Sequence, residues 1–319
     1  MTTWALASRG SALALRQAEI VCAALAEARP GLEIRVDVVR TTGDRRQDVA
    51  LARIGATGIF TKEVDACVLD GRARLAVHSL KDVPTEPPPG LRIAAVLARH
   101  DARDAWVPAP GVAKSLDAVE PGARVGTSSL RRRALLLAAR PDLVLEDLRG
   151  NLDTRLARVH VGDYDGIVVA MAGLRRLGME PAAEPLGPPH WLPAAGQGAL
   201  AVVVAADDDE AATAVGLLDH ADTRTAVTAE RALLRRLQGG CQIPIGAFAS
   251  IEGGILELAA VVSDLGGRRV IRGSRSAEPE RAEAAGVALA EELIGRGADE
   301  IVREIREATG GTVPGAGAP

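Results

Sequence analysis

The stretch of sequence that decides the fold runs from residue 4 to residue 38 and reads WALASRGSALALRQAEIVCAALAEARPGLEIRVDV. Its first four residues are apolar and predict a short buried strand, and residues 11–28 repeat apolar side chains at helical spacing. Arg29-Pro30-Gly31 stops the helix, and residues 32–38 then alternate apolar with charged side chains, which predicts a second strand. A strand, a helix and a strand in this order are typical of α/β proteins with a largely parallel sheet.

The same pattern continues along the chain and then starts again near Asp101. Further elements are expected at residues 60–69, 75–79 and 91–97 of the first block, and at residues 123–126, 130–139 and 143–147 of the second. In both blocks a short strand leads through a serine-containing turn into a helix. This weak repeat suggests two related α/β lobes that face one cleft.

The pattern of expected helices, strands and turns changes after the second block. A proline-rich connection at 181–193 precedes an apolar strand at 198–205, and from Ala221 onwards helices alternate with strands joined by Gly-Gly turns. We therefore predict two α/β lobes around one cleft and a small C-terminal α+β domain. The predicted boundaries are 1–98 with 197–217 for the first lobe, 99–196 for the second, 218–308 for the C-terminal domain and 309–319 for a flexible tail.

Composition excludes several classes of protein. Apolar residues make up 47% and charged residues 25% of the 319 residues, and no apolar run approaches the roughly 20 residues that span a bilayer. A net charge of −4 and 2% aromatic residues argue against nucleic acid as a partner. No Cys/His spacing fits a metal site, and no signal peptide opens the chain. We expect a cytoplasmic protein that binds neither metal, nucleic acid nor membrane.

Basic residues are concentrated in one segment of this acidic chain. Between residues 124 and 176 lie ten arginines and six acidic residues. Ser129 precedes a predicted helix whose first turn carries Arg131 and Arg132, and a helix N-terminus with guanidinium groups is suited to bind anions. The alternative is an ordinary surface helix that Ser129 caps.

Further arginines follow other predicted strands. Arg149 stands at the next strand-to-helix turn, with Arg155 one turn into the following helix, whereas Arg176 and Arg9 follow two more strands. Ligands of open α/β sheets bind at the carboxyl ends of the strands. Arginines at several such ends indicate a ligand with several carboxylates or phosphates.

Two polar sites stand out beside the arginines. Lys81 and Asp82 end the buried strand at 75–79, where a carboxylate could handle a proton or face a developing cation; the alternative is a solvated loop with a Lys/Asp pair. Cys241 follows two glycines in a loop and could be a nucleophile or an attachment point, whereas Cys22 and Cys67 have the spacing of core residues.

Several motifs together resemble the porphobilinogen deaminase (hydroxymethylbilane synthase) family over nearly the whole chain. They are ASRGS at 7–11, TGD at 42–44, FTKE at 60–63, AVHSLKDVP at 76–84, GTSSLRR at 126–132, RGN at 149–151, GQGA at 196–199 and GGC at 239–241. Independent motifs in the same order make a chance match very unlikely.

The resemblance implies an activity. Four porphobilinogen units would be deaminated and condensed head to tail on a dipyrromethane cofactor linked to Cys241 by a thioether, and hydrolysis would release hydroxymethylbilane. The carboxylates of the pyrroles would explain the arginines, and Asp82 would be the catalytic anion. The resemblance assigns cofactor contacts to Lys81, Ser129, Arg131, Arg132 and Arg155, and substrate contacts to Arg9, Ser11, Phe60, Arg149, Arg176 and Gln197. It also implies that the two α/β lobes are like those of periplasmic binding proteins, with the C-terminal domain presenting the Cys241 loop to the cleft. We expect a monomer without a metal.

The sequence departs from the family pattern at two positions. Family members commonly have lysine where this chain has Arg53 and Thr57, so one cation is replaced and one is missing. A second hypothesis from another class is a two-lobed binding module that holds an anionic small molecule without transforming it. Such a module would not need Asp82 beside Lys81 or the Gly-Gly-Cys loop.

Overall fold

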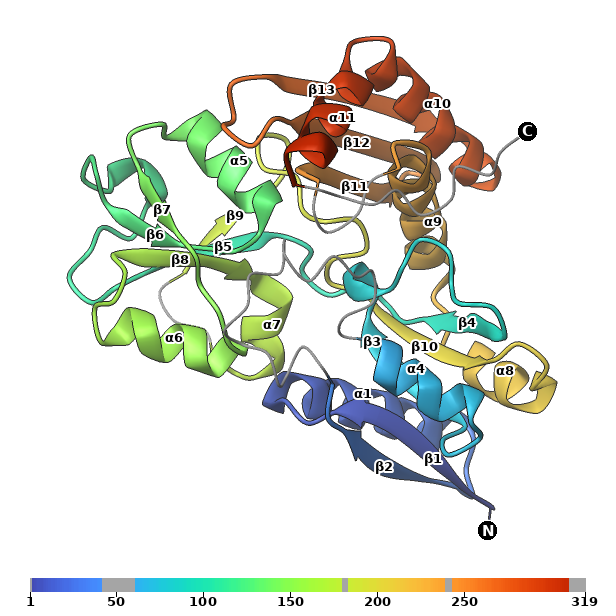
Figure 1. The fold of residues 1–319 in the computed structure, drawn as a ribbon. Coiled ribbons are helices and arrows are strands. Elements are labelled where there is room, and N and C mark those ends of the chain that lie inside the picture. Colours follow the sequence, from blue (N-terminus) through green and yellow to red (C-terminus); the bar gives the residue numbers. More distant parts are fainter. Residues whose placement is uncertain (1, 42–60, 180–182, 239–242, 310–319) are drawn as a thin grey trace.

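The computed structural model describes residues 2–41, 61–179, 183–238 and 243–309. They form two lobes and a C-terminal domain, which lie side by side in Figure 1. Lobe 1 is drawn mainly in blue, lobe 2 in green and the C-terminal domain in orange and red. The predicted fold class is confirmed by the two lobes, each a sheet with helices, and a domain with a three-stranded sheet.

Lobe 1 is built on a five-stranded sheet in the order β2-β1-β3-β10-β4. Its strands are β1 (Thr2–Arg9), β2 (Leu32–Val39), β3 (Leu75–Ser79), β4 (Leu91–Val96) and β10 (Leu200–Ala205), and its helices are α1 (Ala12–Ala28), α4 (Lys62–Leu69) and α8 (Asp209–Gly216). The opening strand, helix and strand are confirmed, and β2 runs parallel to β1 in a register that pairs Trp4 with Ile34. Apolar side chains of β1, α1 and β10 fill the core of the lobe.

Lobe 2 has a sheet of equivalent topology, β7-β6-β8-β5-β9. Its strands are β5 (Asp104–Pro108), β6 (Arg124–Gly126), β7 (Val144–Glu146), β8 (Gly166–Ala170) and β9 (Glu184–Leu186), and its helices are α5 (Leu130–Ala139), α6 (Leu152–His160) and α7 (Met171–Arg176). In each sheet the fourth strand, β10 or β5, runs antiparallel to both neighbours. The largely parallel sheet therefore contains one reversed strand, because the chain enters it from the other lobe.

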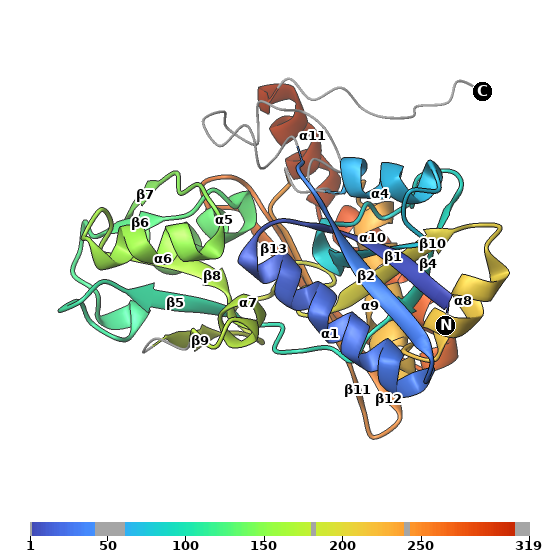
Figure 2. The ribbon, with the colours of Figure 1, turned by 90° about the horizontal axis from the view of Figure 1, so that it is seen from below.

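Two chain segments connect the lobes. They pair with each other through the amide of His100, which donates to the carbonyl of Gly198 (3.1 Å), and the amide of Leu97, which donates to the carbonyl of Leu200 (3.1 Å). Away from these segments, the beginning of α1 approaches α7 of the other lobe (Figure 2). Because Gly198 has φ +91° and a Cβ there would lie 2.5 Å from the carbonyl oxygen of His100, only glycine allows this crossing.

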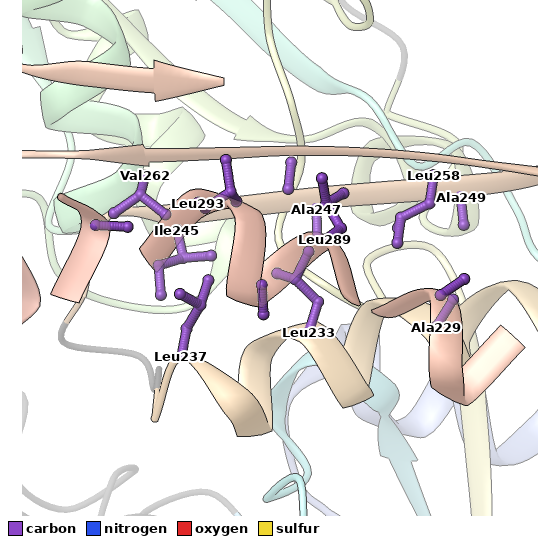
Figure 3. Packing of buried hydrophobic residues seen from close by; sticks show 14 of the residues in the cluster. Ala229, Leu233, Leu237, Ile245, Ala247, Ala249, Leu258, Val262, Leu289 and Leu293 are labelled. Atoms are coloured by element: carbon purple, nitrogen blue, oxygen red, sulfur yellow. The ribbon is translucent and has the colours of Figure 1, made fainter. Parts of the chain in front are cut away.

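The C-terminal domain packs helices against an antiparallel sheet, β11-β12-β13. Its elements are α9 (Ala221–Arg236), β11 (Ile245–Glu252), β12 (Ile255–Ser263), β13 (Val270–Ala277), α10 (Ala282–Ile294) and α11 (Ala298–Thr309). Leu233 of α9 and Leu289 of α10 are fully buried and meet Leu258 and Ala247 of the sheet (Figure 3). The sequence-derived domain boundaries stay a prediction.

Candidate active site

The Lys81–Asp82 pair lies in a short 3-10 turn, Leu80–Asp82, directly after β3. The backbone fixes this turn twice, since the amide of Leu80 donates to the carbonyl of Ala199 (3.0 Å) and the amide of Val83 donates to that of Leu80 (3.1 Å). Both charged side chains are half-buried. The predicted position of Asp82 at the carboxyl end of a buried strand is thus confirmed.

The ammonium group of Lys81 lies in an environment where burial disfavours its charged form. Its Nζ donates to Oε1 of Gln197 (3.2 Å). Burial, reinforced by Arg132, lowers the pKa of Lys81 to about 8, although Asp82 and Asp104 act in the opposite direction. An ammonium group whose pKa is depressed in this way gains stability when an anion binds beside it.

The strand-to-helix turn of lobe 2 has the predicted cap. Ser129 is the N-cap of α5, and its hydroxyl accepts a hydrogen bond from the amide of Arg132 (3.4 Å). The hydroxyl of Ser128 donates to the carbonyl of Leu148 (2.8 Å) and accepts from its amide (3.0 Å), which joins this turn to the end of the neighbouring β7 strand. Arg131 and Arg132 leave the first turn of α5 and are both buried.

Asp104, at the start of β5, is the hub of a buried network that the sequence analysis missed. Its Oδ2 accepts from Nη1 of Arg131 (2.7 Å) and from Nε1 of Trp191 (2.7 Å). Its Oδ1 accepts from Nη2 (2.7 Å) and Nε (3.1 Å) of Arg132 and from Nε2 of Gln197 (2.9 Å). Because Lys81 donates to the same Gln197, a continuous chain of polar groups joins lobe 1 to lobe 2.

Charges explain why this carboxylate is stable in the interior. Burial would raise the pKa of Asp104, but the charges and hydrogen bonds of Arg131 and Arg132 outweigh burial and hold that pKa well below its usual range. Burial also lowers the pKa of Arg131, and Arg132 adds to this shift. One carboxylate thus serves two arginines, so the cluster keeps an excess of positive charge.

Arg149 and Arg155 extend the cationic surface. Arg155, in α6, donates from Nε to the carbonyl of Gly150 (2.8 Å). Burial lowers the pKa of Arg155 to about 10, and Arg132 and Arg149 add to the effect, whereas Asp82 opposes it. Asn151 is the N-cap residue of α6, as expected, but its side chain makes no capping hydrogen bond.

The prediction for Arg176 needs a correction. It lies at the end of α7 and not at a strand-to-helix turn, because the six residues after β8 form a helix of their own. Its Nη2 donates to the carbonyl of Gly198 (2.6 Å), and burial lowers its pKa to about 10. Arg176 therefore reaches the connection between the lobes.

The remaining predicted residues divide into two groups. Arg9 is half-buried at the end of β1, and Ser11 caps α1 by accepting from the amide of Ala14 (3.3 Å). Gln197 is fully buried, and its amide group contacts Lys81, Asp104 and the carbonyl of Ala102 in the first connection. Phe60 and Cys241, like the departures at Arg53 and Thr57, lie outside the described residues.

The site as described is strongly cationic. Lys81, Arg131, Arg132, Arg149 and Arg155 influence one another's charge or share hydrogen-bond partners, and the carboxylates among them are Asp82 and Asp104. Within the described ranges, no group of three or more His, Cys, Asp and Glu side chains is placed to hold a metal ion. The helices of the described residues are also too short or too polar to cross a membrane.

Comparison with family models identifies the class of protein. Residues 5–213 match the model described as porphobilinogen deaminase, dipyromethane cofactor binding domain, and residues 224–295 match porphobilinogen deaminase, C-terminal domain. The chain belongs to the porphobilinogen deaminase family. It is therefore a transferase of tetrapyrrole and heme biosynthesis with hydroxymethylbilane synthase activity, which acts on porphobilinogen and uses a dipyrromethane cofactor. This match favours the enzyme over the binding-module hypothesis.

Solved structures show a distant likeness. One is the methionine binding protein MetQ (13% identity, 67% of this chain and 88% of that chain, TM-score 0.43). Others are the periplasmic binding protein STM4351 of Salmonella typhimurium (11%, 68% and 91%, TM-score 0.39) and the probable amino-acid ABC transporter extracellular-binding protein ytmK of Bacillus subtilis (8%, 67% and 89%, TM-score 0.42). At TM-scores below 0.5, nothing about the function of this chain follows from them.

Proposed function

We propose that this chain condenses four porphobilinogen units head to tail on a dipyrromethane held by a thioether to Cys241, and then releases hydroxymethylbilane by hydrolysis. One observation carries the proposal: a catalytic carboxylate candidate, Asp82, shares a site with a cluster of buried and half-buried cations. The buried chain from Lys81 through Gln197 and Asp104 joins that site to the arginines of α5.

The chemistry of these side chains fits the cofactor. Each of its pyrrole rings carries an acetate and a propionate, and carboxylates pair best with guanidinium groups. Among the described residues, Arg131 donates only through Nη1, so its Nε and Nη2 remain for a ligand. Lys81, whose pKa burial lowers, would also gain from a carboxylate neighbour. The residues that we expect to hold the cofactor are Lys81, Ser129, Arg131, Arg132 and Arg155.

A second group of residues would serve the substrate. We assign the carboxylates of incoming porphobilinogen to Arg9, Arg149 and Arg176, helped by Ser11 and Phe60. Gln197 would act through Lys81, because its buried amide orients that ammonium group. The bound cofactor supplies the free pyrrole α-carbon as nucleophile.

We assign two roles to the carboxylate of Asp82: it stabilises a cationic intermediate and it accepts a proton. Loss of ammonia from the aminomethyl group of porphobilinogen leaves a cationic methylene pyrrole, and a carboxylate at hydrogen-bond distance stabilises that charge and its N–H group. The same carboxylate can accept the proton that the pyrrole α-carbon loses once the new bond forms. The fixed backbone of the Leu80–Asp82 turn supports this assignment, because a positioned group loses little entropy on reaction.

Intact mass before and after denaturation tests the proposal. The wild-type protein should carry a covalent mass of two pyrrole units, and Cys241→Ser should lack it, because a hydroxyl is too weak an acid to supply the nucleophile. Cys22→Ser and Cys67→Ser are the matched controls and should keep the adduct. An unmodified wild-type chain that only binds porphobilinogen would refute the proposal. An adduct on Cys22 or Cys67 would refute the site.

We further infer that the enzyme acts as a cytoplasmic monomer. All the cationic groups of the site and Asp82 come from one chain, so no second copy is needed to complete it. Light scattering of the purified protein should give the mass of a single chain, and a dimer would contradict the inference.

A further inference from the structure

Arg231, in the middle of α9, binds the backbone that follows the Lys81–Asp82 turn. Its Nη1 donates to the carbonyl of Val83 (3.1 Å), and its Nη2 donates to those of Pro84 (2.6 Å) and Thr85 (3.0 Å). Three consecutive carbonyls thus converge on one guanidinium group. This contact links the C-terminal domain to the catalytic turn of lobe 1, and in Figure 1 α9 lies between the two.

The surroundings of Arg231 make the contact strong. Burial lowers its pKa to about 10, with Arg235 and Arg224 adding to the shift, so the group is desolvated but still charged at neutral pH. Hydrogen bonds from a charged donor are roughly twice as strong as those between neutral groups. Three of them restrain a backbone segment that begins one residue after Asp82.

The preceding residue, Glu230, fixes α9 on the opposite side. Its buried carboxylate accepts from the amides of Gly196 (2.6 Å) and Ala249 (2.7 Å) and pairs with Arg99 (2.6 Å) at the connection between the lobes. Adjacent residues of one helix therefore attach it both to the connection and to the catalytic turn.

The same helix leads to the loop of Cys241. α9 ends at Arg236, five residues before Cys241 in the chain. A contact at Arg231 is thus within two helical turns of the residues that precede the loop. One helix therefore both contacts the segment after Asp82 and precedes Cys241 in the chain.

We propose that Arg231 is a positioning residue for Asp82, because it holds the backbone segment that directly follows this carboxylate. This proposal rests on the proposed function, because Arg231 would affect catalysis only through Asp82. Its consequence is that Arg231 governs the chemical step without touching the substrate. Displacing a reacting group by about 1 Å can lower a rate by roughly 10²-fold.

Variants at Arg231 should fold. A cavity of about 170 Å³ adjoins the contact and is lined by Leu80, Thr85 and Arg231 itself, so water can reach the carbonyls that a shorter side chain releases. Arg231→Met keeps the length of the aliphatic stem and removes the donors. Arg231→Lys keeps the charge but cannot bind three carbonyls in the planar geometry of a guanidinium group.

Steady-state kinetics of the holoenzyme test the proposal. Arg231→Met should keep the covalent adduct and a melting temperature close to that of the wild-type protein, lower kcat by about tenfold or more and leave KM within about threefold. Arg231→Lys should fall between the two. Arg235→Met is the matched control, because Arg235 lies one turn further along α9 and pairs instead with Glu283. A kcat for Arg231→Met within twofold of wild type, or equal losses in the control, would overturn the proposal.

A double-mutant cycle with Asp82→Asn separates positioning from general damage. If Arg231 acts through Asp82, Arg231→Met should slow the Asp82→Asn enzyme by less than about threefold. A full tenfold loss in that background would overturn the proposal and leave the role of Asp82 intact. An Asp82→Asn enzyme as fast as wild type would instead refute the proposed function of Asp82, so the two failures are distinguishable.

Discussion

Lobe 1 and lobe 2 share one strand order but carry different charged side chains after their strands. Each sheet has three parallel strands followed by a reversed fourth strand, and each lobe opens a helix with a serine cap, Ser11 or Ser129. β3 of lobe 1 leads into the turn that carries the carboxylate of Asp82, whereas α5, the helix after β6 of lobe 2, carries Arg131 and Arg132. The shared strand order determines where side chains are placed, but it does not determine which chemical groups they carry.

The arginines of lobe 2 differ from Asp82 in a second respect. Arg131 and Arg132 are held by a buried partner of their own lobe, Asp104, whereas Asp82 is held by backbone contacts of its turn. The two arginines to which we assign cofactor binding therefore also form buried ion pairs that hold lobe 2 together. Lobe 1 presents a carboxylate whose turn is positioned by backbone hydrogen bonds.

The largest effect should come from breaking the network of lobe 2. Arg132→Leu leaves Asp104 buried with half of its ion pairs, so the free energy of unfolding should fall by about 3–5 kcal/mol. Arg155→Leu is the control, since the hydrogen bond that Arg155 donates within the described ranges goes to the carbonyl of Gly150 and not to a buried carboxylate. Both variants should lose the cofactor by intact mass, but only Arg132→Leu should shift the urea midpoint strongly. Equal stability losses would show that Asp104 does not anchor the arginines.

Replacing Asp82 should break activity and leave the fold intact. We expect Asp82→Asn to keep the covalent adduct and to lower kcat by at least about 10²-fold, because asparagine can hydrogen-bond but cannot carry the charge. Glu86→Gln, in the exposed part of the same loop, is the matched control and should be close to wild type. A near-normal rate for Asp82→Asn would reduce Asp82 to a structural residue and remove the contrast between the lobes.

Lys81 should make cofactor capture depend on pH. Its folded pKa of about 8 lies below the ordinary 10.5, so its charge destabilises the folded apo-protein below pH 8, and this penalty disappears as the pH rises from 8 to 10.5. Capture of cofactor carboxylates needs the charge and should therefore fall by up to about tenfold between pH 7 and pH 9. Lys81→Arg should remove this decline. The rate of adduct formation on apo-protein, followed by mass, provides the measurement.

The smallest effect concerns the segment with the two departures from the family pattern. A cation in an exposed loop contributes roughly 0–1 kcal/mol, so the absence of lysine at Thr57 should be tolerated. Arg53→Ala should raise KM at low salt if Arg53 has taken over the charge, and Thr57→Lys should change KM little or lower it modestly. High salt should abolish both differences. An Arg53→Ala enzyme with unchanged KM at low salt would leave capture to the arginines of the sheets.

The sequence predicts local structure well and long-range partners poorly. The β2 alternation and the Ser129 cap depend on neighbouring residues, and both are confirmed. The sequence analysis did not predict the role of Asp104, because its hydrogen-bond partners lie 27 to 93 residues away in the chain. A charged residue directly before the apolar run Ala105-Trp106-Val107 was the one feature of the sequence that indicated a buried charge. Arg176 was misplaced because nothing in the sequence distinguishes the six residues of α7 from a loop.

The insertion of β10 into the sheet of lobe 1 constrains how the chain folds during synthesis. Among the strands that the structure describes, β4 pairs with β10 alone, and those of lobe 2 lie between residues 104 and 186. On the ribosome, lobe 2 can thus complete its sheet while β4 still has no hydrogen-bonding partner. A folded lobe 2 then brings residues 96 and 200 close together, which lowers the entropy cost of closing the intervening loop. During synthesis we therefore expect lobe 2 to complete its sheet first, lobe 1 to complete its sheet second, and the C-terminal domain to fold last.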